Sequence, residues 1–467
     1  MSSPKFRDLS SGSKSLVIIE LAFFAGALLL TVYLNSLFSF VEHHDIPNDR
    51  LAICAIVFAL VVQLSSLALG LYNSKLRENY RGIVRRLLVS VAIGFFIVTL
   101  LNPLYGQHAL EIELLALSAL VSLIVASAFR YVTLQVDFFG FNKRVVLVLG
   151  AGDRASIIEK RMRRDVDRQG FYMHGFVIMP GDTENGIVNE NRIELDGSLV
   201  NYALEHGIDE IVVASDERRD NLPVDELFAC KIRGVEITEI LDFIERETGQ
   251  IAVNLIYPSW VIYSNGFASA NHLRNTLDWA FNAGIAMLLV LVTWPVMLIT
   301  AILIKLDEGM SAPIFYLQER VGLDGQAFNI YKFRSMRVDA EKNGAQMASE
   351  NDDRTTSIGK FIRKYRVDEL PQILNVLRGD MGFVGPRPER PEFVQQLIKN
   401  LPYYNERHNV KPGLTGWAQL KYPYGSTEED SLEKLKYDLY YIKHRSFMLD
   451  LLILIRTVEI VLFGKGR

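Results

Sequence analysis

Four apolar stretches, each long enough to cross a lipid bilayer, constrain the fold of this chain more than any other feature of its sequence. They extend over residues 15–40, 51–71, 87–104 and 110–136. Hydrophobic residues make up 49% of the 467 positions and the mean hydropathy is positive, which is high for a soluble protein. Buried helices of a large soluble protein are the alternative, but four such stretches in succession favour a membrane protein.

The basic residues around these stretches alternate in number. They precede the first stretch, are abundant in the second loop and follow the fourth stretch at Lys143 and Arg144, whereas the first loop has only Arg50 and the third has none. Because basic loops stay on the cytoplasmic side, the N-terminus and everything after Arg144 are predicted to be cytoplasmic. The two cysteines, Cys54 and Cys230, form no disulfide or zinc framework, which fits a reducing compartment.

Residues 143–266 show alternating strand and helix patterns. Val145–Leu149 is a β-branched apolar run of the buried-strand type, and the turn Gly150–Ala155 follows it directly. This pattern predicts a doubly wound, Rossmann-like α/β domain. The turn has the G-x-G-x-x-A form of a dinucleotide-binding fingerprint, but no acidic residue stands where a ribose contact is expected. Since tight turns also need glycine for steric reasons, we interpret the domain as structural or regulatory, without a redox cofactor.

An acidic pair, Asp368-Glu369, lies within a group of motifs rich in basic residues and glycine. Carboxylates among arginines and lysines are typical of sites that hold phosphates and perform nucleophilic or metal-assisted chemistry on them. For the pair alone, salt bridges on an exposed helix face are the commoner explanation, but four ordered motifs together favour a site. The motifs are Lys332–Met336, Arg363–Gln372, Gly379–Pro388 and Lys411–Gln419.

Two arginines precede the acidic pair on a predicted helix over residues 360–377, which Pro371 would interrupt just after the pair. The interruption would hold both carboxylates at a kink. Arg363 and Arg366 are expected to lower the pKa values of the carboxylates and to neutralise an approaching phosphate.

Other cations of these motifs are candidates for gripping phosphates. Lys332 and Arg334 could hold a diphosphate, and Arg387 is fixed between two prolines, which reduces the entropy lost on binding. The segment Lys411–Gly413 offers backbone N–H groups and small residues to a ligand, with a plain turn as the alternative. Tyr437-Asp438 lies on an amphipathic helix and serves either the site or the packing of that helix.

Together, the motifs resemble the bacterial sugar transferase family, the monotopic polyprenyl-phosphate sugar-1-phosphate transferases. The resemblance covers nearly the whole chain and looks closest to the large members that begin exopolysaccharide or O-antigen assembly. It implies transfer of a sugar-1-phosphate from a UDP-sugar to undecaprenyl phosphate, with release of UMP. It also implies that Asp368 is the nucleophile of a covalent phosphosugar intermediate and that Glu369 helps to hold Mg²⁺.

The resemblance assigns further residues. Arg363 and Arg387 match phosphate-binding arginines of the family, and Asp438 matches an acidic residue of its tyrosine-rich helix. The family also has a membrane hairpin broken at a Ser-Pro pair. Here the pair is Trp294-Pro295, so the serine is missing while the proline that would cause the kink is retained.

A fifth apolar stretch, residues 277–306, contains Pro295 near its middle. If this stretch crossed the membrane, the motifs would lie outside the cell, whereas nucleotide sugars are made inside. We therefore predict a re-entrant hairpin kinked by the proline, with a plain kinked span as the alternative. Residues 447–463 are apolar but carry charges, which indicates a helix lying in the membrane interface.

These inferences predict a membrane protein with α and α/β parts. Residues 1–142 form four transmembrane helices, 143–266 the Rossmann-like domain, and 267–467 a mainly α-helical monotopic catalytic domain. The predicted location is the bacterial inner membrane, with the catalytic domain on the cytoplasmic face. A net charge of −4 and the lack of a long basic run argue against a nucleic-acid partner. A homodimer and the identity of the sugar are left open.

Two competing hypotheses are a nucleotide-sugar modifying enzyme that uses NAD and a membrane scaffold without activity. The first needs a Tyr-x-x-x-Lys pair, and no tyrosine of this sequence has a lysine four residues later. A scaffold that binds anionic lipids would need only the basic residues, and the acidic pair would work against it.

Overall fold

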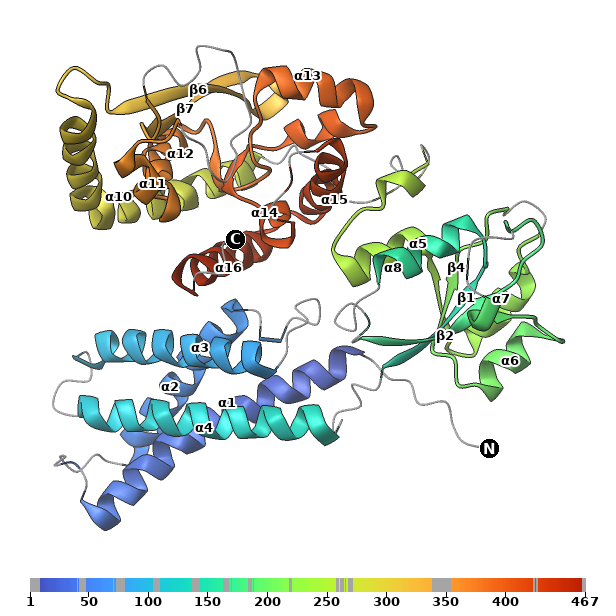
Figure 1. Ribbon diagram of the computed structural model, residues 1–467. Coiled ribbons are helices and arrows are strands. Elements are labelled where there is room, and N and C mark those ends of the chain that lie inside the picture. Colours follow the sequence, from blue (N-terminus) through green and yellow to red (C-terminus); the bar gives the residue numbers. More distant parts are fainter. Residues whose placement is uncertain are drawn as a thin grey trace. The chain divides into compact units, whose positions relative to one another are not determined.

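A computed structural model describes residues 9–39, 41, 48–69, 71–72, 80–103, 110–136, 143–162, 168, 170–183, 187, 189–217, 221–257, 260, 264, 266–267, 272–337, 354–422, 425 and 427–463. The chain divides into two compact units, Met1–Gly249 and Gln250–Arg467 (Figure 1). The predicted domain boundaries near residues 142 and 266 stay predictions.

The first unit begins with four apolar helices, as the sequence predicts. They are α1 (Leu9–Phe38), α2 (Asn48–Ala68), α3 (Tyr80–Leu101) and α4 (Ile112–Val136). Three contain a segment long and apolar enough to cross a membrane, and α2 has a shorter apolar segment, Leu51–Leu67. The helices form a bundle in which α1 and α3 each contact both α2 and α4 (Figure 1).

Apolar side chains fill the centre of this bundle, among them Phe24 and Phe58, neither of which is exposed. An ion pair from Arg130 of α4 to Glu20 of α1 is buried beside them, and Tyr72 donates a hydrogen bond to the same carboxylate. Because both residues are buried, their pairing offsets the cost of removing the two charges from water. Of the basic residues between the second and third apolar stretches, Lys75 and Arg77 lie outside the described residues, whereas Arg81, Arg85 and Arg86 belong to α3.

A five-stranded parallel sheet follows in the same unit. Its strand order is β3-β2-β1-β4-β5, which is the order of a doubly wound α/β sheet. The predicted strand Val145–Leu149 lies at the centre, where a continuous apolar run is buried on both faces. The elements are β1 (Arg144–Leu149), α5 (Asp153–Arg161), β2 (Phe171–Val177), β3 (Arg192–Ile193), α6 (Leu199–Glu205), β4 (Glu210–Val213), α7 (Val224–Ile232), β5 (Glu236–Glu239) and α8 (Ile240–Thr248).

The glycine-rich turn after β1 is closed by carboxylates of the same domain. Asp216 accepts hydrogen bonds from the backbone N–H groups of Asp153 and Arg154, at 2.9 and 2.8 Å, and Asp182 accepts one from Ala151 at 2.7 Å. A Cβ atom on Gly152 would lie 2.0 Å from an oxygen of Asp216. The glycine is therefore needed for the close approach of this carboxylate.

The longest helix of the second unit is α10 (His272–Glu308), whose apolar segment Asp278–Glu308 is also long enough to cross a membrane. Pro295 lies inside this helix, and Figure 1 shows α10 bent into two arms. Proline removes a backbone donor and is expected to cause such a bend. Large apolar side chains such as Leu291 and Trp294 stay exposed on α10, as on a helix that lipid covers.

The rest of the second unit is mainly helical, with two pairs of short strands. β6 (Phe315–Val321) and β7 (Ala327–Phe333) form an antiparallel hairpin, and β8 pairs with β9 in parallel. The other elements are α11 (Ser357–Lys364), the 3₁₀ turn η6 (Val367–Gln372), α12 (Ile373–Arg378), β8 (Gly382–Val384), α13 (Pro391–Asn400), the 3₁₀ turn η7 (Tyr404–Asn409), β9 (Gly413–Thr415), α14 (Trp417–Lys421), α15 (Glu428–His444) and α16 (Phe447–Phe463).

Candidate active site

The acidic pair lies in a tight turn between two helices. Helix α11 ends at Lys364, and Arg366 then takes the left-handed conformation with φ of 57°. Asp368 and Glu369 follow in η6, and Pro371 lies inside that turn, just before α12. The helix therefore ends earlier than predicted, because a left-handed residue, rather than the proline, breaks its hydrogen-bond ladder.

Asp368 is buried without a fixed partner for one of its oxygens. The residue is only 8% exposed, and its Oδ1 atom has no hydrogen-bond partner among the residues that the structure describes. Burial, and then the neighbouring charge of Glu369, raise the pKa of Asp368 to about 6. The predicted lowering by Arg363 and Arg366 is present but is outweighed, since burial disfavours the charged form.

Glu369 has the opposite environment. Its Oε1 atom lies 2.8 Å from Nη2 of Arg387, 3.7 Å from Nη1 of Arg366 and 3.9 Å from Nζ of Lys332. Burial alone would raise the pKa of Glu369, but these cations, Arg387 first, lower it to about 2. The pair thus consists of one firmly ionised carboxylate and one that titrates near neutrality, a division typical of carboxylates with different roles.

Strand β7 carries Lys332 toward the pair. Burial lowers the pKa of Lys332 to about 8, although the charge of Glu369 acts in the opposite direction. The strand is fixed by Asn375 of α12, whose Oδ1 accepts from Tyr331 N at 3.0 Å and whose Nδ2 donates to Asn329 O at 2.8 Å. Asn375 is fully buried and lies outside the residues selected from the sequence, which gave no signal for it.

The remaining predicted cations differ in position. Arg363 is close enough to act on the charge of Asp368 but makes no ion pair with either carboxylate among the described residues. Arg334 donates from Nε to the carbonyl of Pro313 at 3.1 Å, at the base of the β6–β7 hairpin. The structure therefore brings Lys332, Arg366 and Arg387 into contact with Glu369, whereas the described contact of Arg334 is with Pro313.

The loop that carries Arg387 is held by its backbone carbonyls. Each carbonyl from position 386 to position 389 accepts a hydrogen bond from another part of the second unit, so the loop is fixed before any ligand binds. The donors are Gly413 N to Pro386 O at 3.0 Å, Arg407 Nη2 to Arg387 O at 2.9 Å, Arg320 Nη1 to Pro388 O at 3.1 Å and Val321 N to Glu389 O at 2.9 Å.

The glycines of the last motif pack against this loop. A Cβ atom on Gly413 would lie 2.1 Å from the backbone nitrogen of Gly385, so the two strands β8 and β9 approach too closely for any side chain there. The N–H group of Gly413 is used by the loop carbonyl of Pro386. For this glycine, packing explains the residue without a ligand. Lys411 itself lines a separate cavity, described below.

Asp438 lies behind the loop rather than beside the acidic pair. It forms an ion pair with Arg407 at 2.9 Å, and both residues are buried. Burial raises the pKa of Asp438 to about 6, against the effect of Arg407. Burial also opposes the charge of Arg407, but Tyr404 and Asp438 raise its pKa above the ordinary value. Since Arg407 holds the carbonyl of Arg387, Asp438 supports the loop through Arg407.

Comparison with known proteins shows the family. The sequence profile described as "Bacterial sugar transferase" matches residues 273–464. A UDP-glucose:undecaprenyl-phosphate glucose-1-phosphate transferase of Escherichia coli (strain K12) is 30% identical over 377 residues, which cover 79% of this chain and 79% of that protein.

Two further relatives match over shorter parts of their own length. A UDP-N-acetylgalactosamine-undecaprenyl-phosphate N-acetylgalactosaminephosphotransferase of Aeromonas hydrophila is 38% identical, over 54% of this chain and 59% of that protein. An undecaprenyl-phosphate glucose phosphotransferase of Komagataeibacter xylinus is 31% identical, over 69% of this chain and 60% of that protein. With Lys332, Arg366 and Arg387 gathered around Glu369, this chain belongs to the bacterial sugar transferase family.

Proposed function

We propose that this protein transfers a sugar-1-phosphate from a UDP-sugar to undecaprenyl phosphate, releasing UMP, as the first membrane step of exopolysaccharide or O-antigen assembly. The names of its relatives and the acidic pair among cations support this reaction. The observation that carries the proposal is the contrast within the pair. Asp368 has an oxygen without a partner and a pKa of about 6, whereas Glu369 is fixed by Arg387.

Asp368 serves as the nucleophile of a two-step transfer. Its carboxylate oxygen attacks the sugar-bearing phosphorus of the donor, a new P–O bond forms, and the bond from that phosphorus to the UMP oxygen breaks. An oxygen of the lipid phosphate then attacks the same phosphorus and releases the carboxylate. A carboxylate with a pKa of about 6 is largely ionised at pH 7 and more basic than an ordinary aspartate, as a nucleophile should be.

The cations make an attack by one anion on another feasible. Lys332 and Arg387 contact Glu369 and lie where the charge of a diphosphate would develop during transfer. Strand β7 fixes the position of Lys332, and the hydrogen-bonded loop around Arg387 fixes the position of that arginine. Little reorganisation should therefore accompany the reaction. Arg363 and Arg366 add to the positive potential felt by Asp368.

The acidic pair provides part of a Mg²⁺ site, and the phosphates of the donor would supply the other ligands. Within the described part of the chain, no three His, Cys, Asp or Glu side chains come together as a metal site. Mg²⁺ is commonly bound by one or two carboxylates together with substrate phosphates. Glu369, whose described ion pairs all go to Oε1, and the free oxygen of Asp368 are the residues that would hold it. Bound there, the ion would neutralise phosphate charge.

We propose that the reaction takes place at the inner leaflet of the bacterial inner membrane. We propose that α1 to α4 span the bilayer, that α10 enters and leaves on the cytoplasmic side at its Pro295 bend, and that α16 lies in the interface. Trp294 replaces the serine of the family hairpin, and its exposure on α10 suits contact with lipid. A homodimer stays a prediction.

The NAD-dependent alternative is disfavoured by the glycine turn of the α/β domain. A dinucleotide would place its pyrophosphate on the N–H groups of this turn, and Asp182 and Asp216 already accept from them. We therefore propose that this Rossmann-like domain has a structural or regulatory role.

The test is UMP release from UDP-sugars by membranes that contain the protein, with Mg²⁺ and undecaprenyl phosphate. UDP-glucose, UDP-galactose and UDP-N-acetylgalactosamine should be compared, since the relatives carry names with different sugars. We expect release from at least one donor and its loss in Asp368→Asn at normal protein levels. Unchanged release by the variant would remove Asp368 from the mechanism.

A further inference from the structure

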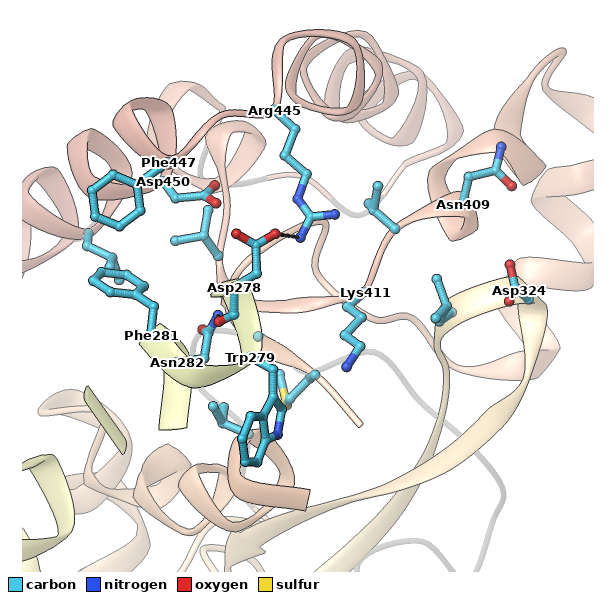
Figure 2. A pocket seen from close by; sticks show the side chains of 17 residues that line it. Asp278, Trp279, Phe281, Asn282, Asp324, Asn409, Lys411, Arg445, Phe447 and Asp450 are labelled. Carbon is cyan, nitrogen blue, oxygen red and sulfur yellow. Dashed lines mark hydrogen bonds and ion pairs between the residues drawn. The ribbon is translucent and has the colours of Figure 1, made fainter. Parts of the chain in front are cut away.

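A cavity of about 420 Å³ lies in the second unit, apart from the acidic pair (Figure 2). Its lining comes from the first turns of α10, from α12 and β8, from the segment before β9 and from α16, and includes neither Asp368 nor Glu369. Cavities of this size commonly bind small ligands or parts of larger ones. The cavity could therefore hold a head group and the first part of a chain attached to it.

Two donors of hydrogen bonds meet in this cavity. The ammonium group of Lys411 has no hydrogen bond or ion pair with any described residue, and Figure 2 shows it pointing into the space beside Trp279. A Cβ atom built on Gly379 would lie 3.6 Å from Lys411 Nζ and 3.8 Å from Trp279 Nε1, so both nitrogens border the same small space. A lone cation beside an indole N–H is a binding arrangement for an anion.

Most acidic residues of the lining already have partners. Asp278 pairs with Arg445 at 2.7 Å, and Asp450 accepts a hydrogen bond from Tyr441 at 2.8 Å. Asp324 is the third acid of the lining and belongs to the 3₁₀ turn Leu323–Gly325. An anion is therefore best placed between Lys411 and Trp279.

The cavity also lies where lipid head groups are expected. Asp278 is the first residue of the apolar segment of α10, and Phe281 of α10 packs edge-on against Phe447 of α16 with ring centroids 4.8 Å apart. Tryptophan near the end of a membrane-embedded helix, as Trp279 is in α10, is typical of the head-group level. A ligand here should combine an anionic head with an apolar tail.

We propose that this cavity docks the phosphate of the polyprenyl acceptor lipid on Lys411, which deepens the proposed function and rests on it. The six residues of α12, a length of about 9 Å, separate the turn with the acidic pair from the end of α12 beside Lys411. A phosphate bound at Lys411 is therefore beyond bonding distance of Asp368. The cavity would hold the acceptor beside the active site, and the head group must move toward Asp368 before the transfer.

The test separates the two half-reactions in nanodiscs that contain a titrated amount of undecaprenyl phosphate. For Lys411→Gln we expect the acceptor KM to rise about tenfold to hundredfold, since one charge-assisted hydrogen bond is lost. The UMP burst measured without acceptor should persist, and Lys411→Arg should recover most of the loss. Lys399→Gln, which removes an exposed lysine of α13, is the matched control and should keep the wild-type acceptor KM.

Other results would overturn the docking site. A wild-type acceptor KM in Lys411→Gln, or a loss of its UMP burst, would show that Lys411 does not serve the acceptor. If phosphatidylglycerol competes for the cavity as strongly as undecaprenyl phosphate binds to it, the cavity is a site for bulk membrane lipid. Trp279→Phe gives a second, independent variant, with a smaller rise in acceptor KM expected. If the wild-type protein itself gives no UMP burst, the proposed function fails instead.

Discussion

Replacing the nucleophile should make the protein more stable while it removes the activity. Asp368 is buried, has an oxygen without a partner, and has a pKa raised by burial to about 6. Its ionised form is therefore destabilised in the folded state. Asp368→Asn keeps the shape of the side chain and removes the charge. The folded state of the variant should therefore be free of the energetic cost of burying an ionised carboxylate.

The magnitude follows from the pKa. Because the folded-state pKa exceeds the ordinary 3.8, the folded protein binds more protons than the unfolded chain between about pH 4 and pH 6, and stability falls as the pH rises through this window. Above pH 6, the ionised carboxylate of Asp368 lowers the free energy of unfolding by about 3 kcal/mol. We take this value as the upper limit of the gain in Asp368→Asn at pH 7. For a unit of this size, about 1 kcal/mol raises the melting temperature by roughly 2–4 °C.

The matched control is Glu369→Gln, because Glu369 is also buried but its cations, Arg387 first, lower its pKa to about 2. Removing this charge leaves the cations without their carboxylate and should destabilise the folded state by about 1–3 kcal/mol. Thermal unfolding in detergent should therefore show a higher melting temperature for Asp368→Asn and a lower one for Glu369→Gln at pH 7. The gain should vanish near pH 4. A lower melting temperature for Asp368→Asn would refute the reasoning.

Three further predictions concern single sites. The kcat/KM for the donor should rise with pH, reach half of its maximum near pH 6 and level off above about pH 7, because Asp368 must be ionised to attack. A kcat/KM that does not change between pH 5 and 7 would contradict this. Glu369→Gln should lower both transfer activity and melting temperature, by about 1–3 kcal/mol of stability, because the cations at Oε1 lose their carboxylate, and unchanged unfolding would argue against these contacts. Asp216→Ala should expose the amides of Asp153 and Arg154 to hydrogen exchange, with a stability loss of about 1 kcal/mol, whereas unchanged exchange would show that the carboxylate does not close the turn.

Parts of the fold that rest on local patterns could be predicted from the sequence. The central strand around Val145–Leu149 could be predicted because a short β-branched apolar run that ends at a glycine turn is typical of a buried strand. The apolar helices follow from length and hydropathy. The gathering of Lys332, Arg366 and Arg387 around Glu369 could be inferred from the motifs.

Other features depend on contacts that no local pattern encodes. Arg407 and Asp438 pair across 31 positions of the sequence, and neither spacing nor composition connects them. The helix before the acidic pair ends at Lys364, and the left-handed residue that follows it is Arg366. Arginine rarely adopts this conformation, so no glycine marks the position in the sequence. Burial of Asp368 reverses the pKa shift expected from its neighbouring arginines, because desolvation is set by tertiary packing.

The central claim is that Asp368 becomes bonded to the phosphorus of the donor. Acid-quenched protein, incubated with the UDP-sugar and Mg²⁺ but without acceptor lipid, should be digested and examined by mass spectrometry. The account predicts a sugar-phosphate adduct on the peptide that contains Asp368, absent in Asp368→Asn and discharged when undecaprenyl phosphate is added. An active enzyme that carries no adduct there, or carries it on another residue, would contradict the account.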